Sequence, residues 1–379
     1  MKKLPVFVLS TALLLPSAVP VYAADKAPVV QSQTLTYEQA LEKAFASSIP
    51  LKNAGDEIDR AFEVRQSAGS SIEYYPTGTG NGAQAAIDRA KIKGVAQADA
   101  VWGISKRQYE LEKDNIIYSV KNAYNNVLKA QKQQKLADAS AKNAELQKVL
   151  ASYKAAEGTI SLYELSQEEA KFESALKQKA AAAKAVEDAY LKLNSVIGAS
   201  KETRFVLNDE PQFKPFDKDE TELENDIVYI VSNSNAVAMA EDQVKLKRLD
   251  VDLYTYNAGN TTPYKASEID VRTAANKVQD TKQKLSDGMR SIYYSIKQLE
   301  DQYKVLLIEK EKAEETLKMA KVRYDAGVGI KADVVTAELA VANNEKQIFD
   351  TLIQLDNLKL AYEKPWVAAG GAGTASGSN

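Results

Sequence analysis

Residues 285–329 read LSDGMRSIYYSIKQLEDQYKVLLIEKEKAEETLKMAKVRYDAGVG, and this stretch decides the fold. Its apolar side chains recur at alternating steps of three and four residues, with Lys310 as the only interruption: Leu285, Met289, Ile292, Ile296, Leu299, Tyr303, Leu306, Ala313, Leu317, Ala320 and Tyr324. This spacing places one apolar seam along one face of a helix, and such a seam needs a partner over its whole length. No proline occurs from Lys265 to Tyr324. The sequence therefore predicts a single helix of about 90 Å, at about 1.5 Å per residue.

A glycine turn ends this helix, and a second helix returns along it. Gly327 and Gly329 follow Tyr324 closely, and glycine permits the left-handed backbone that ends a helix. The returning seam again follows sums of three and four: Val334, Val341, Ile348, Leu352, Leu355 and Tyr362. The segment from Lys265 to Glu363 is therefore predicted to form a long antiparallel helical hairpin.

The composition excludes several classes of function. The 379 residues include 49 Lys and Arg against 52 Asp and Glu, with both signs interspersed, which gives no electrostatic case for binding nucleic acid. The chain has no histidine and no cysteine, which removes the usual metal sites, thiol nucleophiles and His-based triads. We therefore expect no catalytic, cofactor-binding or metal-binding residues and no enzyme activity. A lipidated cysteine anchor is excluded as well.

The N-terminus predicts export. Lys2 and Lys3 precede an apolar run from Leu4 to Leu15, and the small residue Ala23 suits cleavage by a signal peptidase. The apolar run is too short for a permanent spanning helix, and no later stretch reaches the roughly 20 apolar residues that one needs. Residues 1–23 are predicted to be a signal peptide.

The first half of the remaining chain contains its own short helices and its own long hairpin. Thr36 is a candidate N-cap with Gln39 three residues on, as in a capping box, and Pro50 divides this region into a short and a longer helix. A Gly-rich patch over 68–82, with a short strand at Ile72, Tyr74 and Tyr75, precedes a helical pattern over 83–153. A turn at 155–161 and a returning helix that stops at Gly198 complete this half.

The second half repeats the order of elements. A connector over 199–221, with one short strand, leads to a second pair of short helices over 222–252 and a second irregular patch over 254–266. A shift of 186 positions places Leu41 on Ile227 and Leu51 on Val237, and a shift of 169 places Gly158 on Gly327. We predict an all-α-dominated fold of two tandem repeats, 24–198 and 222–367, with at most short β segments. The second hairpin turns at 325–331, and 368–379 is expected to be a disordered tail.

Two motifs in this frame resemble the TolC family of outer-membrane efflux proteins. Residues 35–44, LTYEQALEKA, are similar to the opening signature of the family, and 324–338, from Tyr-Asp-Ala-Gly to Asp-Val-Val-Thr-Ala-Glu, are similar to its tip turn. The resemblance covers about 35–363. It implies a homotrimer whose hairpins form one hollow tube, docking at its tip to a periplasmic adaptor protein and an inner-membrane transporter.

The resemblance also implies that the glycine turns form a tip that opens and closes. The candidate tip and gate residues are Tyr324, Gly327, Gly329, Asp333, Tyr153, Gly158 and Glu164. The family often has a basic residue where Gly329 stands and a second acid where Thr336 stands, so the tyrosine–arginine–aspartate latch is incomplete here. An alternative role for Asp333 is the N-cap of the returning helix.

The sequence departs from the family in the segments that would enter a membrane. A spanning β-hairpin needs about 20–24 residues with its turn, and 68–82 and 254–266 are shorter. We expect the β-barrel to be shortened or lost, which leaves contact with a membrane open. The predicted function is an efflux duct of the outer membrane and periplasm. The alternative is a secreted or envelope-associated helical scaffold without transport, extracellular or wall-associated in a cell with no outer membrane.

Overall fold

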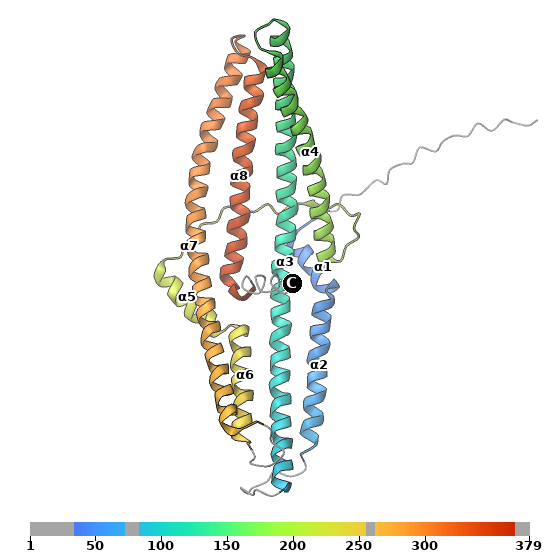
Figure 1. The fold of residues 1–379 in the computed structure, drawn as a ribbon, viewed down its shortest axis with the longest axis vertical. Coiled ribbons are helices and arrows are strands. Elements are labelled where there is room, and N and C mark those ends of the chain that lie inside the picture. The colour runs from blue at the N-terminus through green and yellow to red at the C-terminus, as the bar shows by residue number, and fades with distance from the viewer. Residues whose placement is uncertain (1–33, 73–82, 255–261, 368–379) are drawn as a thin grey trace, which may run out of the picture.

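A computed structural model describes residues 34–72, 83–254 and 262–367 as an elongated bundle of helices (Figure 1). In chain order the elements are β1 (Thr34–Leu35), α1 (Tyr37–Ser47), α2 (Ile49–Ser70), α3 (Ala83–Ala156), α4 (Leu162–Ile197), β2 (Val206–Leu207), α5 (Glu220–Ser232), α6 (Asn235–Asp252), α7 (Tyr264–Asp325) and α8 (Lys331–Glu363). The all-α-dominated fold with two long helical hairpins is confirmed. The predicted signal peptide and C-terminal tail lie outside the described residues.

The long helices α3 and α7 form the frame of the molecule (Figure 1). They contain 74 and 62 residues. Toward the top of Figure 1, α4 returns along α3 and α8 returns along α7, while α2 and α6 accompany the lower parts of α3 and α7. Helix α3 also packs against α8 above and α6 below, and these contacts join the two halves into one wall.

The starts of α1 and α2 confirm the sequence signals that predicted them. The side chain of Thr36 accepts a hydrogen bond from the Gln39 N–H, and the Gln39 side chain accepts from the Thr36 N–H, which completes a capping box. Ser48 caps α2, and Pro50 lies in its first turn, where a missing N–H costs nothing.

Three predicted boundaries are wrong by a few residues. Helix α2 continues to Ser70, so the irregular patch predicted to start at residue 68 starts inside the helix. Gly69 is exposed and does not end the helix. Helix α7 already begins at Tyr264, and α5 begins at Glu220 because Asp219 caps it. Ile72 is not in a strand, and the remainder of that predicted strand and most of the two patches lie outside the described residues.

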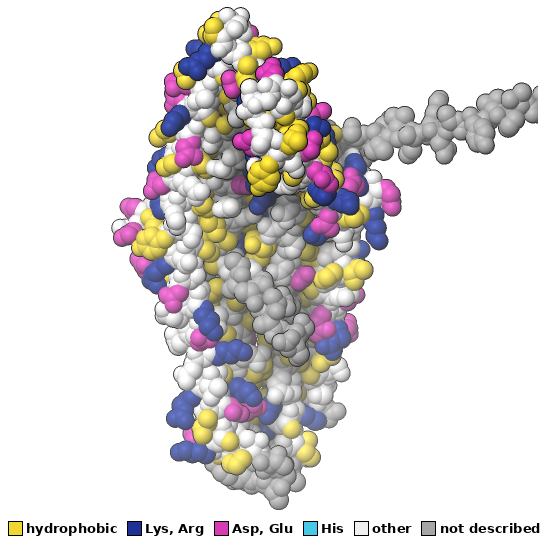
Figure 2. Space-filling view, turned by 45° about the horizontal axis from the view of Figure 1, so that its top comes forward, with side chains coloured by type: hydrophobic (Ala, Val, Ile, Leu, Met, Phe, Trp, Pro, Cys, Tyr) yellow, Lys and Arg dark blue, Asp and Glu magenta, His cyan; other side chains and the backbone are white. Residues whose placement is uncertain are grey.

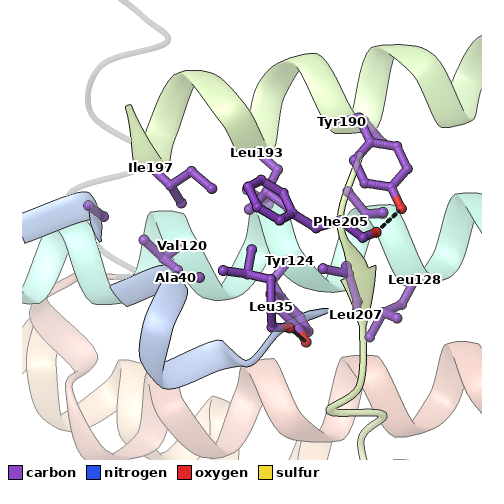
Figure 3. Close-up of a cluster of buried hydrophobic side chains, with 14 of the residues drawn as sticks. Leu35, Ala40, Val120, Tyr124, Leu128, Tyr190, Leu193, Ile197, Phe205 and Leu207 are labelled. Carbon is purple, nitrogen blue, oxygen red and sulfur yellow. Dashed lines mark hydrogen bonds between the residues drawn. The ribbon is translucent and has the colours of Figure 1, made fainter. Parts of the chain in front are cut away.

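The first hydrophobic core lies where α1 and a short sheet meet the first hairpin (Figure 3). Strand β1 pairs in parallel with β2, which confirms a strand in the connector, although no β1 was predicted. Side chains of α3 and α4 point toward each other and toward these strands. The Tyr124 hydroxyl donates to the Leu35 carbonyl at 2.9 Å, and the Tyr190 hydroxyl donates to the Phe205 carbonyl at 2.6 Å. Burial raises the pKa of both tyrosines.

The second core repeats the first at a constant offset. Buried residues of α3 and α4 recur 169 positions later in α7 and α8, as in the pairs Ile116 and Leu285, Val120 and Met289, Tyr124 and Tyr293, Val127 and Ile296, Val186 and Leu355, and Leu193 and Tyr362. The tyrosine contact recurs too, because the Tyr293 hydroxyl donates to the Lys218 carbonyl at 3.2 Å. The two hairpins therefore bury the same positions in the same register.

The surface carries both charge signs in mixture (Figure 2). Lys and Arg side chains alternate with Asp and Glu over the face shown, as the balanced composition predicts. Within the described ranges, every helix is too short or too polar to traverse a membrane.

Candidate functional site at the tip

The two glycine turns lie at the same end of the molecule, at the top of Figure 1. The first joins α3, which ends at Ala156, to α4, which begins at Leu162. The second joins α7, which ends at Asp325, to α8, which begins at Lys331. All seven predicted tip residues therefore lie at or next to these turns.

The first turn is closed by hydrogen bonds of its own backbone and a complete cap. Gly158 has a φ of +72°, and the Thr159 N–H donates to the Lys154 carbonyl at 2.9 Å. The Glu164 N–H donates to Ser161 Oγ at 3.2 Å, and Glu164 Oε2 accepts from the Ser161 N–H at 2.7 Å. These bonds from Ser161, the backbone bond above all, lower the pKa of Glu164. Glu164 thus has a defined structural role at the start of α4.

The second turn has the same backbone but no side-chain cap. Gly327 also has a φ of +72°, and the Val328 N–H donates to the Arg323 carbonyl at 3.0 Å. Ile330 occupies the N-cap position, where Ser161 stands in the first turn, and it has no side-chain group that can cap α8. The two turns differ, therefore, in how the returning helix begins.

Gly329 differs from Gly327 in its backbone conformation and in its close neighbours. Its φ is not in the left-handed region, so the interpretation that both glycines supply such a backbone holds only for Gly327. The Gly329 N–H donates to the Arg323 carbonyl at 2.9 Å, and a Cβ on Gly329 would lie 3.0 Å from the Arg323 Cβ. A side chain at position 329, including the basic residue that the family often has there, would therefore require Arg323 to shift slightly.

Asp333 is not the N-cap of α8. The cap position belongs to Ile330, and Asp333 lies three residues later in the first turn of α8, with an exposed side chain. An acid there is favoured by the helix dipole. Among the residues that the structure describes, no hydrogen bond or ion pair joins Tyr324 to Asp333. Their roles in a gate stay a prediction.

A polar contact between the hairpins near the tip was missed by sequence reasoning. The Thr336 hydroxyl donates to Asn143 Oδ1 at 3.0 Å and accepts from Gln147 Nε2 at 3.2 Å. We call Asn143, Gln147 and Thr336 the tip clasp. It links α8 of the second hairpin to α3 of the first. The sequence marked Thr336 as a departure from the family, but nothing in it points to partners about 190 positions away.

The surface of the tip is rich in exposed apolar side chains. Tyr153, Leu162 and Tyr163 are exposed around the first turn, and Val328 and Ile330 around the second. Such a concentration of exposed apolar groups is typical of a surface that binds another protein.

The comparisons with known proteins agree with this architecture. Residues 235–360 match the family model of outer membrane efflux proteins. The fold over most of the chain is similar to that of the outer-membrane channel OprN, with a TM-score of 0.66 and 12% identity over 88% of this chain and 90% of that one. By sequence over 235–360 and by fold over most of its length, the chain resembles the TolC family of outer membrane efflux proteins.

Two further outer-membrane structures share this fold. The CmeC outer membrane channel of Campylobacter jejuni has a TM-score of 0.63 and 13% identity, over 98% of this chain and 99% of that one. The outer membrane protein VceC of Vibrio cholerae has a TM-score of 0.59 and 16% identity, over 86% and 94%. No curated protein sequence matches the chain. The family model and these structures are those of channel proteins of the outer membrane.

Proposed function

We propose that this chain is one protomer of a trimeric efflux duct. The observation that carries the proposal is an exposed apolar stripe along α7. Tyr294, Ile308 and Val322 are separated by 14 residues, as are Val305 and Met319, and all five side chains are largely exposed. Fourteen residues are two heptads, so each series stays on one side of the helix. We call these five residues the α7 edge.

The corresponding side of α3 is covered below the tip. Tyr294 of the α7 edge corresponds, 169 positions earlier, to Asn125 on the side of α3 that packs against α8, whereas Val322 corresponds to the exposed Tyr153 at the tip. Helix α7 therefore lacks a neighbour that α3 has. By the same offset, α8 corresponds to α4, and the exposed alanines Ala170 and Ala180 of α4 stand where Leu339 and Phe349 of α8 face α3. Alanines allow two helices to approach closely, so α4 of another copy is a fitting partner for the α7 edge.

Repeating this contact closes a ring. Each copy supplies one free α7 and one free α4, which makes the contact head-to-tail, and a head-to-tail contact that closes gives a cyclic assembly. The family resemblance implies three copies and six hairpins around a lumen. The channels OprN and CmeC, to which the fold is similar, support the interpretation of that lumen as a duct. We place the duct in the cell envelope.

The tip is the proposed site of partner binding. Its exposed apolar side chains, above all Leu162, Tyr163 and Val328, fit the periplasmic adaptor protein that the resemblance implies, with an inner-membrane transporter beyond it. The tip clasp between α3 and α8 would hold the two hairpins of a copy together when the tip is closed. Tyr324, Asp333 and the two turns are then the moving parts.

The mass of the purified mature protein tests the ring. We expect three copies per particle, with and without detergent, and a central lumen in electron micrographs. A variant with Val305→Glu and Ile308→Glu should be monomeric, because two charges would be buried in the closed interface. Glu309→Gln, on the same helix, is the matched control and should stay trimeric. A wild-type protein that is monomeric at high concentration contradicts the proposal.

Transport is tested separately from assembly. Deleting the gene should raise the sensitivity of the cell to exported compounds, and the wild-type gene should restore resistance. The ring-breaking variant should not restore it. If intact trimers form and deletion changes no sensitivity, the helical scaffold without transport becomes the better interpretation.

A further inference from the structure

Within one chain, the contact between α3 and α8 joins two neighbouring hairpins, and a ring would repeat this kind of contact between α7 of one copy and α4 of the next. Where α3 meets α8, Asn125 Nδ2 donates to Asp356 Oδ2 at 3.1 Å and to Asn357 Oδ1 at 3.0 Å. Lys121 Nζ lies 2.7 Å from Asp356 Oδ2. Asn125 is only 2% exposed, so these bonds are protected from water and hold α3 and α8 in one register.

The constant offset between the hairpins predicts which residues meet in the proposed contact between α7 of one copy and α4 of the next. Shifting by 169 positions carries Lys121 to Arg290 and Asn125 to Tyr294, both on α7. The same shift, taken backwards, carries Asp356 to Glu187 and Asn357 to Asp188, both on α4. The buried pairs Tyr124 and Tyr293, and Leu193 and Tyr362, show that this offset holds in the three-dimensional structure at the same level.

The chemistry of these positions is complementary. A base and an acid occupy the same places as Lys121 and Asp356, with Arg290 in place of the lysine and Glu187 in place of the aspartate. The side chains of Arg290 and Glu187 are 39% and 59% exposed, so a second copy can reach both. Arg290 already pairs with Glu224, and Glu187 with Arg204. Bringing the two pairs together would produce a row of alternating charges.

We propose that Arg290 of one copy pairs with Glu187 of the next, with Tyr294 beside Asp188, and that this contact fixes the register in which the ring closes. The inference rests on the proposed ring and names the contact that aligns its members. The apolar α7 edge can slide along an alanine-rich face, because heptad contacts look alike at every second turn. A specific charge pair at one level removes that freedom, as polar groups do in coiled coils.

Engineered cysteines test the register directly, because the chain has none of its own. A Tyr294→Cys, Asp188→Cys variant should form disulfides between copies, since the equivalent residues Asn125 and Asn357 are in hydrogen-bond contact. Disulfides need Cα atoms about 4.4–6.8 Å apart. Mild oxidation should therefore give a ladder of dimers and trimers in denaturing gels.

A matched control places the second cysteine on the same face of α4 but at a different position along the helix axis. Ser174 lies two heptads before Asp188 and is also exposed, which displaces it by about 21 Å along the helix. The Tyr294→Cys, Ser174→Cys variant should give no ladder. A ladder of equal strength in this control overturns the proposal, and so does a missing ladder for Tyr294→Cys, Asp188→Cys in a particle whose mass is that of a trimer. A monomeric wild-type particle would instead overturn the ring itself.

Charge exchange tests the pair energetically. Arg290→Glu and Glu187→Arg should each weaken the trimer by about tenfold or more on dilution, followed by mass photometry, and the double variant should recover most of that loss. Recovery requires that the two side chains meet, because within one chain each has a different partner. Losses that simply add in the double variant would show that they do not meet.

Discussion

The two hairpins of this chain share a core and differ at their free sides. Tyr124 and Tyr293 lie at the same place in the first and second core, and each donates its hydroxyl to a backbone carbonyl of a preceding segment. Yet α3 is covered by α8 on a side where α7 is exposed to solvent. The comparison distinguishes residues that stabilise a hairpin by being buried in its core from exposed apolar residues that are free to contact another copy of the chain. Only the first kind must be the same in both repeats.

Two isoleucines of α7 provide the strongest test of this distinction. Ile296 is fully buried, whereas Ile308, on the same helix, is 68% exposed. Ile296→Ala should lower the free energy of unfolding by about 2–5 kcal/mol, because it leaves a cavity in the second core. Ile308→Ala should change the stability of a protomer by less than about 0.5 kcal/mol and should weaken the trimer instead. Chemical denaturation and mass measurements distinguish the two. Equal loss of folding stability in both variants would contradict the distinction.

Glycines with the same backbone should differ in how costly their replacement is. Gly198 and Gly158 both have positive φ. A Cβ on Gly198 would collide with Ser47, whereas a Cβ on Gly158 would have no atom of another part of the chain within 4 Å. Gly158→Ala should cost about 1–2 kcal/mol, which is the strain of the left-handed backbone alone. Gly198→Ala should cost more, because α1 must move. Thermal unfolding of both variants measures the difference, and a smaller loss for Gly198→Ala would be unexpected.

The unequal caps of the two turns predict smaller, opposite changes. Ser161→Ala removes the cap of α4 and should cost about 0.5–2 kcal/mol. Ile330→Ser places a capping hydroxyl at the equivalent position of α8 and should slow amide hydrogen exchange in its first turn. Val328→Ser, at a position that caps no helix, is the control. If Ile330→Ser speeds exchange there, packing of the isoleucine rather than capping determines the start of α8.

Of the two turns, the first should show a pH dependence that the second lacks. Hydrogen bonds from Ser161 lower the pKa of Glu164 in the folded protein, so its stabilising effect is complete above the ordinary pKa of a glutamate. The effect is lost as the pH falls through the lowered value. Amide exchange at the start of α4 should therefore accelerate in acid relative to a Glu164→Gln variant. The start of α8, which lacks this cap, should show no such difference.

The long helices, the start of α1 and the division between α1 and α2 were predictable because local signals determine them. The three-and-four spacing, the capping box at Thr36 and the position of Pro50 each act within a few residues. Lys310 interrupted the seam, and the structure explains it, because its ammonium lies 3.2 Å from Glu345 of α8 and 3.5 Å from Glu314. The interruption in sequence is therefore an interhelical ion pair in space.

The missed features depend on residues far apart in the chain. The pairing of β1 with β2 involves two residues on each side, too few for an alternating pattern to be visible. The tip clasp joins three ordinary polar residues of α3 and α8. The gate roles of Tyr324 and Asp333 came from the family resemblance, and the structure adds their exposure and the close approach at Gly329.

The small sheet limits the order in which the first core can fold, because β1 can pair only after β2 has been synthesised. Leu35 is enclosed by the first core and pairs with Leu207, and the N–H of Tyr37 donates to Asp209, so the entry to α1 depends on the connector. During synthesis, some 170 residues must follow Leu35 before its partner Leu207 becomes available. Until then the first hairpin has an open site at its base. The apolar residues of the first core that contact Leu35 and Leu207 are therefore covered only after the connector has been made.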